Sequence, residues 1–564
     1  MRVGLGTRSC SRNEGMGKVF ELKSFLRMVC AVVSIFAWGH VFAAQNEVFV
    51  FSASEGYYTS IARHLVRWLK MEAIETTCET NADLGARLAG CKLAFLVGYN
   101  EPTEKQMKAL ERFIAEGGKL VVFYSASPRL SALMDVQVVG YRAAKYPGEW
   151  SRMNFTGQGP AGLPATIRQT STVLQCARPR SKQGCVIATW VDRKGQGTQE
   201  PAWIMTKNGF WMTHILTADG DEDFKAQLVG ALTGAVLPRL WNAEAHRRRV
   251  EAHHQATRAV ALKQVPRKGE LHAVWDHSGC GLYPGDWKRT MKQLQEARMT
   301  DLFVNVAGAG FAHYPSKVLP PSRTYEQEGD QLAACLAAAQ GTGIRVHAWL
   351  LCFNTTRSRG GLDRYIKPAW RLKARTGEVT EYLNPASEDV QAYLLRAIDE
   401  LIARYPALSG IHLDFVRWYE RAEKPPNAPE VLSDFVADVR RHVRRPRWLT
   451  TAVLGKYPAC IGSVGQDWES WVRTNLVDYV VPMNYSNNVK QYTSFIQQQG
   501  SRKSLAHRVI SGIGVTANES RLSALEVIQQ INIARKYNLA GVALFDLDVT
   551  LEKNILPYLK LGIW

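Results

Sequence analysis

The sequence lacks the short motifs that mark common metal and redox sites. Its ten cysteines form no Cys-x-x-Cys pair, and no His-Glu-x-x-His segment or other close Cys/His cluster occurs among its 564 residues. A structural zinc site needs such spacing, so we expect no metal ion and no cofactor. With 46% hydrophobic and 21% charged residues, the composition excludes a disordered or coiled-coil chain and indicates a globular protein.

Apart from one segment near the start, the chain also lacks a long apolar run. Six basic and two acidic residues between Arg2 and Arg27 precede an apolar stretch, Met28 to Phe42, which leads into Ala43. This pattern is typical of a secretory signal peptide, so we expect residues 1–43 to be removed and the mature protein to be secreted or periplasmic. An uncleaved anchor is the alternative, although the stretch is short for a membrane span. We expect no stable membrane insertion after cleavage.

Acidic residues are too few to balance the basic ones. Lys and Arg number 70 against 51 Asp and Glu, which gives a net charge of +19. A surplus of this size favours acidic partners such as nucleic acid, anionic lipid or charged polysaccharide. Because an exported protein meets little nucleic acid, we expect a polysaccharide partner and no nucleic acid. In an oxidising compartment the pairs Cys78/Cys91 and Cys176/Cys185 could form disulfides. The sequence leaves these pairings and the oligomeric state open.

Residues 46–238 alternate between apolar strands and helical patterns, which predicts a doubly wound α/β domain with a parallel sheet. The expected strands are Glu47–Ser52, Leu93–Gly98 and Lys119–Tyr124, and the expected helices are Tyr58–Met71 and Thr103–Glu116. The stretch from Phe113 to Phe123 resembles non-catalytic relatives of the class I glutamine amidotransferase fold. Amidotransferases place a reactive cysteine on the elbow between a strand and a helix, whereas this strand leads into Tyr124-Ser125-Ala126-Ser127. We therefore expect an accessory domain, and residues 239–266 read as a charged helical linker.

From residue 267 onward the pattern predicts a (β/α)8 TIM barrel, because strand and helix alternate eight times. The strands are continuously apolar, as buried parallel strands are. They are expected at residues 271–276, 301–307, 345–351, 410–416, 448–454, 479–485, 508–514 and 541–547. The predicted fold class is thus a barrel over residues 267–564, preceded by a doubly wound α/β accessory domain.

Barrel active sites lie at the C-terminal ends of the strands, so charged residues at those ends are the catalytic candidates. Asp414 ends the fourth strand, and strand alternation places it on the same face as His412. Burying a lone carboxylate costs several kcal/mol, which favours a catalytic role. An ion pair with Arg417 or His412 is the structural alternative.

Acid–base catalysis by carboxyl groups commonly uses two of them, whose environments separate their pKa values. Asp546, at the end of the eighth strand, is the first candidate, and Asp276, at the end of the first, is the next. Glu420 and Asp548 could reach the site from loops. Which group is the acid and which the base or nucleophile depends on burial, so the sequence leaves the roles open.

Other strand ends carry aromatic and hydrogen-bonding residues that suit a carbohydrate cleft, because aromatic faces stack on sugar rings while polar groups bind hydroxyls. The substrate-binding candidates are Trp275, Asn305, His347, Trp349, Asn484 and Tyr485.

In their order along the chain, the barrel motifs resemble those of the glycosyl-hydrolase-like 10 family. They include Val346-His-Ala-Trp-Leu, Gly410-Ile-His-Leu-Asp-Phe-Val-Arg and Val481-Pro-Met-Asn-Tyr-Ser. The resemblance covers about residues 268–564. It implies an exported bacterial barrel protein that cleaves O-glycosidic bonds of a polysaccharide. A peptidoglycan glycosidase acting on peptide-free glycan strands is among the family's members.

The family 18 chitinases show where a catalytic acid would be expected on the fourth strand. Those enzymes carry Asp-Gly-x-Asp-x-Asp-x-Glu on the fourth strand and Met-x-Tyr on the sixth. Asp414 stands at the last Asp position and Met483-Asn484-Tyr485 matches the sixth strand, but His412 replaces an Asp and Val416 replaces the acidic Glu. The alternative is therefore a non-catalytic carbohydrate-binding or scaffold protein of the cell envelope. A third hypothesis, an amidotransferase-like enzyme, lacks its nucleophile.

Overall fold

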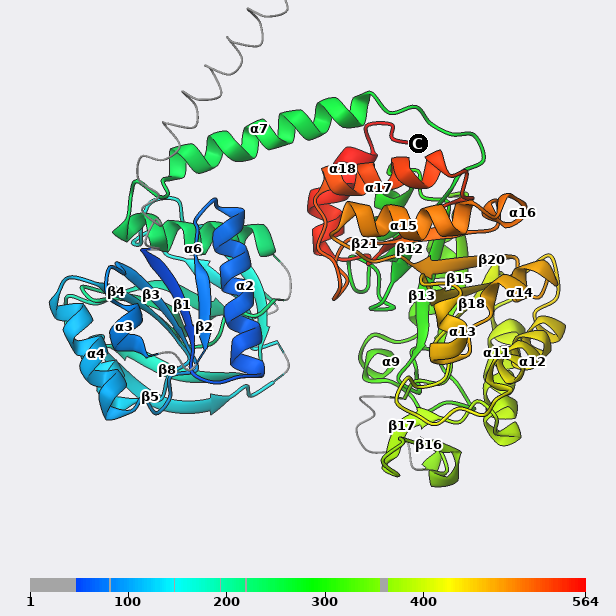
Figure 1. Cartoon of the computed structure of the whole chain (residues 1–564), viewed down its shortest axis with the longest axis horizontal. Helices are drawn as coiled ribbons and strands as arrows, with labels where there is room; N and C mark the ends of the chain where they lie inside the picture. Colours follow the sequence, from blue (N-terminus) through cyan, green and yellow to red (C-terminus); the bar gives the residue numbers. More distant parts are fainter. Residues whose placement is uncertain (1–46, 81–82, 147, 193, 219–220, 356–363) are drawn as a thin grey trace, which may run out of the picture. The chain divides into compact units, whose positions relative to one another are not determined.

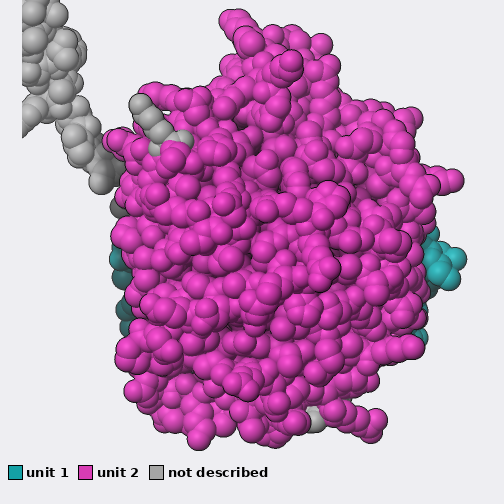
Figure 2. Space-filling view, turned by 90° about the vertical axis from the view of Figure 1, so that its right-hand side faces the viewer, with its two compact units in different colours: residues 1–246 teal, residues 247–564 magenta. Residues whose placement is uncertain are grey.

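The computed structural model describes residues 47–564 apart from residues 81–82, 147, 193, 219–220 and 356–363. The expected signal peptide, residues 1–43, lies outside the described part. The chain forms two compact units, residues 1–246 and 247–564, which are coloured separately in Figure 2. The division falls inside helix α7 (Ala243–Leu262), within the region predicted as a linker. No helix of the described residues is long and apolar enough to cross a membrane.

Unit 1 is built on a nine-stranded sheet in the order β2-β1-β3-β4-β11-β10-β9-β6-β7. The parallel half contains β1 (Val48–Ser52), β2 (Thr77–Thr80), β3 (Leu93–Val97), β4 (Lys119–Phe123) and β11 (Gly209–Met212). The antiparallel half contains β6 (Trp150–Phe155), β7 (Thr166–Ser171), β9 (Cys185–Val191) and β10 (Gly197–Thr206). The expected parallel sheet is thus confirmed only for the first half. Short turns join β9, β10 and β11, and such turns can connect only antiparallel strands.

Helices cover both faces of this sheet, as in a doubly wound fold (Figure 1). On one face, α2 (Tyr57–Met71) and α6 (Glu222–Val236) bury an apolar core that includes Leu65 and Leu228. The other face is covered by α3 (Leu84–Arg87), α4 (Glu104–Ala115) and α5 (Pro128–Leu133). A separate antiparallel ribbon consists of β5 (Val136–Ala143) and β8 (Val173–Pro179).

The cysteines of the described residues are all free thiols. The pairs Cys78/Cys91 and Cys176/Cys185, which the sequence offered as disulfides, are not bridged. Burial raises the pKa of Cys91 to about 12, so this thiol stays protonated at neutral pH.

Unit 2 is a closed barrel of eight parallel strands. The sheet order is β12-β22-β21-β20-β19-β18-β15-β13, and β12 also pairs with β13, which closes the ring. The strands are β12 (Leu271–Asp276), β13 (Asp301–Gly308), β15 (Arg345–Leu351), β18 (Gly410–Asp414), β19 (Trp448–Leu454), β20 (Tyr479–Met483), β21 (Ile510–Gly514) and β22 (Gly541–Phe545). This confirms the predicted (β/α)8 barrel, and each observed strand end lies within two residues of its predicted position.

Helices surround the barrel and bury a core between themselves and the strands. The longer ones are α8 (Trp287–Glu296), α10 (Gln331–Ala339), α11 (Glu388–Arg404), α12 (Ala428–His442), α15 (Val489–Gly500) and α17 (Ala524–Lys536). Shorter ones are α9 (Arg323–Glu328), α13 (Ala459–Val464), α14 (Trp468–Arg473), α16 (Lys503–Ala506) and α18 (Leu556–Leu559). The hairpin of β16 (Arg371–Lys373) and β17 (Val379–Leu383) follows β15, and β14 (Phe311–Ala312) pairs with β13.

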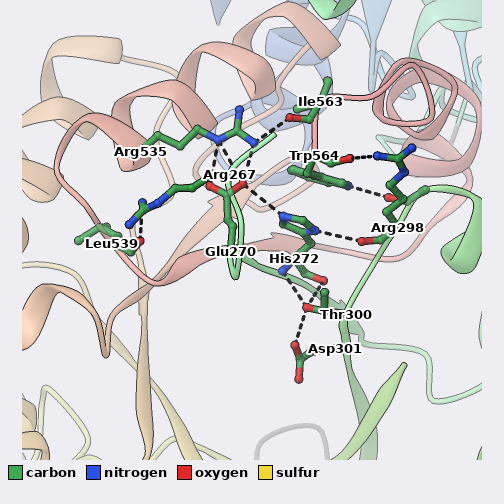
Figure 3. Close-up of polar contacts among 11 residues, drawn as sticks. Arg267, Glu270, His272, Arg298, Thr300, Asp301, Arg535, Leu539, Ile563 and Trp564 are labelled. Carbon is green, nitrogen blue, oxygen red and sulfur yellow. Dashed lines mark hydrogen bonds and ion pairs between the residues drawn. The ribbon is translucent and has the colours of Figure 1, made fainter. Parts of the chain in front are cut away.

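A polar network at the N-terminal end of the strands joins the first strand to α17 and to Trp564 (Figure 3). Glu270 accepts hydrogen bonds from the Arg535 guanidinium, the shortest at 2.6 Å. The ring of His272 stacks on Trp564, with centroids 4.3 Å apart, and Arg298 donates to the Trp564 carbonyl at 2.8 Å. These contacts tie β12 to α17 where the barrel closes.

The second half of α7 packs on the barrel. Thr257 and Ala261 are fully buried, and Val260 contacts the barrel core. His254 Nδ1 and the Tyr558 hydroxyl are 2.7 Å apart. Although α7 begins as a charged, exposed helix, its end therefore belongs to the barrel.

We expect the fragment 247–564 to unfold cooperatively and at a higher temperature than the fragment 264–564. The shorter fragment loses the buried α7 contacts, which stabilise it by about 2 kcal/mol, and its Tm should fall by several degrees. Circular dichroism melts of both fragments test this. Equal melting temperatures would show that α7 contributes nothing to the barrel.

Candidate active site

Asp414, the last residue of β18, is 5% exposed at the C-terminal end of the barrel. One carboxylate oxygen accepts the backbone N–H of Phe415 at 2.6 Å, and the other accepts the indole N–H of Trp349 at 3.3 Å. Burial raises the pKa of Asp414, although Arg417 and these two donors oppose the shift. Asp414 is therefore a buried carboxyl group that is hydrogen-bonded to N–H groups.

His412, also on β18, is neutral. The indole N–H of Trp275 donates to His412 Nε2 at 2.9 Å, so Nε2 carries no proton and Nδ1–H donates to the Thr450 hydroxyl at 2.8 Å. Burial holds the pKa of His412 well below its ordinary value. A neutral ring cannot form the ion pair with Asp414 that the sequence offered as an alternative.

Arg417 follows Asp414 by three residues. Its guanidinium lies 4.0 Å above the Phe415 ring, and the described residues show no ion pair between it and Asp414. It lowers the pKa of Asp414 only through longer-range attraction. The ion-pair alternative is therefore not realised with Arg417 either.

Asp546 follows β22 and is the second carboxyl group at this end. Burial raises its pKa to about 8, and the charges of Asp548 and Asp276 add to the shift. Within the described parts of the chain, no hydrogen bond reaches its carboxylate oxygens. A carboxyl group with this pKa is largely protonated at neutral pH and can donate a proton.

Tyr485 lies within electrostatic reach of both carboxyl groups. It is half-buried, and its ring stacks on Phe545 with centroids 5.4 Å apart. Burial raises the pKa of its hydroxyl well above the ordinary value, and Asp414, Glu519 and Asp546 raise it further. The hydroxyl is thus protonated. The structure brings Asp414, Asp546 and Tyr485 together at the mouth.

Asp276 does not join this group. It is fully buried, and its two oxygens accept hydrogen bonds from the Ser278 hydroxyl at 2.6 Å and the Gly281 N–H at 2.9 Å. Trp275, its neighbour, points into the barrel, so strand alternation turns Asp276 outward. Contrary to our expectation of a catalytic role, Asp276 supports the loop after β12.

Two of the expected substrate-binding residues lie away from the mouth. His347 is fully buried in the lower part of the barrel and bonded to Asp301 at 2.8 Å. Asn484 faces outward, and its side-chain N–H group donates to Gln499 and Ser511, both at 3.0 Å. These positions correct the expectation for both residues.

The remaining candidates form the wall beneath the mouth. Trp275 and Trp349 are 1% and 3% exposed, which leaves little ring surface for a sugar, and their N–H groups are bonded to His412 and Asp414. Asn305 donates to the carbonyl of His277 at 3.2 Å, while its buried side-chain oxygen has no partner.

Sequence reasoning missed a pair of stacked tyrosines. The rings of Tyr382 and Tyr419 lie 4.3 Å apart at an angle of 16°, and both are half-buried. The charge of Arg417 lowers the pKa of Tyr382, so the pair lies near the loop that follows Asp414. Tyr419 could have been found from its position five residues after Asp414. Tyr382 comes from the β16–β17 hairpin, which no pattern in the sequence predicted.

No group of three or more His, Cys, Asp or Glu side chains in the described regions is arranged to hold a metal ion.

Glycoside hydrolases built on a (β/α)8 barrel use carboxyl groups at the C-terminal end of the strands, and this barrel carries Asp414 and Asp546 there. Residues 273–428 match the glycosyl hydrolase-like 10 family. The resemblance expected from the motifs is thus confirmed over this range. No curated protein matches the chain in sequence.

The solved structures that match this chain include those of three proteins. Alpha-L-fucosidase isoenzyme 2 from Paenibacillus thiaminolyticus is 12% identical with a TM-score of 0.40, and the match covers 52% of this chain and 48% of the fucosidase. The endo-1,4-beta-mannanase from Rhizomucor miehei is 10% identical with a TM-score of 0.37, covering 49% of this chain and 86% of the mannanase. A ThuA-like protein from Bacteroides uniformis is 14% identical with a TM-score of 0.28, and the match covers 35% of this chain and 94% of the ThuA-like protein. This chain thus spans about half the length of the fucosidase.

We expect Asp546→Asn to stabilise the protein increasingly as pH rises. Because the folded pKa of Asp546 is about 8 and the unfolded value is about 4, the native protein loses stability between these pH values. The Tm difference between variant and wild type should therefore grow by a few degrees from about pH 5 to about pH 8. Asp434→Asn, at an exposed carboxyl group on α12, is the control. A pH-independent difference for Asp546→Asn would contradict the raised pKa.

Proposed function

We propose that the protein is an exported glycoside hydrolase that cleaves O-glycosidic bonds of a bacterial polysaccharide, with peptide-free glycan strands of peptidoglycan as the leading substrate. The proposal is carried by two carboxyl groups with raised pKa values, Asp414 and Asp546. Both lie close enough to Tyr485 to raise the pKa of its hydroxyl group. The net charge of +19 favours an acidic polymer as substrate. We expect neither nucleic acid nor membrane lipid as a partner.

The environments of the two carboxyl groups suggest different roles. Asp546 has a pKa of about 8 and negative neighbours, so it is the general acid that protonates the leaving oxygen. Asp414 has two N–H donors and the nearby Arg417, which favour its ionised form. It therefore acts as the base or nucleophile, or stabilises the positive charge that develops on the sugar. The Tyr485 hydroxyl can donate a hydrogen bond to the substrate between them.

A second candidate is a non-catalytic carbohydrate-binding or scaffold protein of the cell envelope. Val416 favours this second candidate, because a fully buried valine occupies the position where a chitinase carries its catalytic acid. The proposed enzyme needs its acid from another strand, and Asp546 is the residue at the mouth that fits. Release of reducing ends from peptide-free glycan strands separates the two functions, because a binding protein releases none.

We expect Asp414→Asn and Asp546→Asn each to lower kcat by about 10²–10⁴-fold, because each change removes proton chemistry with little change of shape. Asp434→Asn is the matched control, since this carboxyl group is exposed on α12. Reducing-end assays and circular dichroism measure turnover and folding. Full turnover in either folded variant would remove that residue from the mechanism.

We also expect kcat/KM to fall as pH rises through about 8, because Asp546 must be protonated to act as the acid and its pKa is about 8. A pH series on one soluble glycan gives this limb of the profile. If activity stayed constant from about pH 7 to about pH 9, another group would have to be the acid.

A further inference from the structure

Four tyrosines from three separate segments gather at one edge of the unit 1 sheet. Tyr57 and Tyr58 begin α2 after β1, Tyr124 follows β4, and Tyr141 lies in β5. Burial is the main reason why the pKa of Tyr124 is raised, and Tyr141, Tyr58 and Tyr57 contribute to the rise. The rings of Tyr57 and Tyr58 are 5.8 Å apart. Tyr141 pairs with Gln175 of β8, whose N–H donates to the carbonyl of Thr213, just after β11. We call these four residues the tyrosine cluster.

The outer members of the tyrosine cluster present their rings to solvent. Tyr57 and Tyr141 are each 64% exposed, while Tyr58 and Tyr124 are half-buried. Val139, two residues before Tyr141 in β5, is 63% exposed. Apolar surface concentrated in this way marks a binding site more often than a solvated face.

Tyr124 has an uncommon backbone conformation that directs it to this edge. Its φ of 47° lies in the left-handed region, which is unfavourable for a bulky residue. The elbow that follows is held by a hydrogen bond from the Ser125 hydroxyl to the Tyr99 carbonyl at 2.7 Å and one from the Ala126 N–H to Asn100 Oδ1 at 3.0 Å. The strand-to-helix elbow of the amidotransferase-like fold is thus present with a tyrosine on it.

The residue on this elbow is suited to binding rather than to nucleophilic attack. Because the pKa of Tyr124 is raised, its phenol stays protonated at neutral pH. The edge of its ring faces His214, which follows β11, with ring centroids 5.5 Å apart. What the elbow presents is an aromatic ring with a hydroxyl group.

Tyr58 is fixed in place beneath the exposed rings. Its ring packs against Gly98, which ends β3, so closely that a Cβ atom there would lie 2.6 Å from the ring. The side-chain N–H of Asn100 donates to the Tyr58 hydroxyl at 3.4 Å. A ring that is already ordered loses little entropy when a ligand binds.

We infer that the tyrosine cluster is a second glycan-binding site, separate from the barrel mouth and without catalytic activity. It lies at the carboxyl ends of β1, β3 and β4, where open α/β sheets bind their ligands. Tyrosine faces can stack on the C–H faces of sugars while the hydroxyl groups bind sugar hydroxyls. The choice of a glycan strand as the ligand rests on the proposed function, because the barrel would cleave the same polymer.

The test uses the full chain with Asp414→Asn, so that the polymer is not cleaved, and peptide-free sacculi as the probe. Adding Tyr57→Ala and Tyr141→Ala together should weaken binding about tenfold, because two stacking rings are lost. Met71→Ala is the matched control, since Met71 is a 45% exposed residue at the opposite end of α2. This control should bind like its parent.

Activity is measured separately with Asp414 intact, on a short soluble glycan. The tyrosine double variant should cleave it at the wild-type rate. Unchanged binding to sacculi, or an equal loss of activity on the short substrate, would overturn the inference. If the wild type cleaves nothing but binding still depends on the tyrosines, the proposed function fails and the second site stands.

Discussion

The closure of the barrel is the constraint on which the rest of unit 2 depends. All eight strands are parallel, and the pairing of β12 with both β13 and β22 closes them into one ring. Their C-terminal ends therefore meet at a single rim, and residues more than 100 positions apart in sequence, such as Asp414 and Asp546, share one mouth. The bond between Glu270 and Arg535 secures the seam at the opposite end.

Buried carboxyl groups behave in opposite ways at the two ends of the barrel. Burial alone would raise the pKa of Asp301, yet hydrogen bonds from His347 and Arg345 bring it well below its ordinary value. Among the residues that the structure describes, no ion pair with Asp414 or Asp546 compensates burial in this way, and the pKa values of both carboxyl groups are raised. The lower end thus uses paired charges for stability, whereas the mouth keeps carboxyl groups that can exchange protons.

Unit 1 places an aromatic residue on the turn that follows β4. Tyr124 has a left-handed backbone conformation there, and the residues that follow it lead into α5 without a cysteine. An exposed ring next to it, such as Tyr57, suits polymer binding. Under the proposed function, a second binding site on the same protein raises the local concentration of the glycan polymer that the barrel cleaves.

The barrel could be predicted from the sequence, because eight continuously apolar segments, each followed by a helical pattern, are typical of buried parallel strands covered by helices. The pattern also identified Asp414, and alternation along β18 correctly placed His412 on the same side. Alternation says which side of a strand a residue faces, but not its height in the barrel or its partners. That Asp276 holds a loop, that His347 pairs with Asp301 at the lower end and that Asn484 faces the helices is visible only in the folded protein. Those outcomes depend on strand register and on side chains brought in from distant elements, which no local pattern contains.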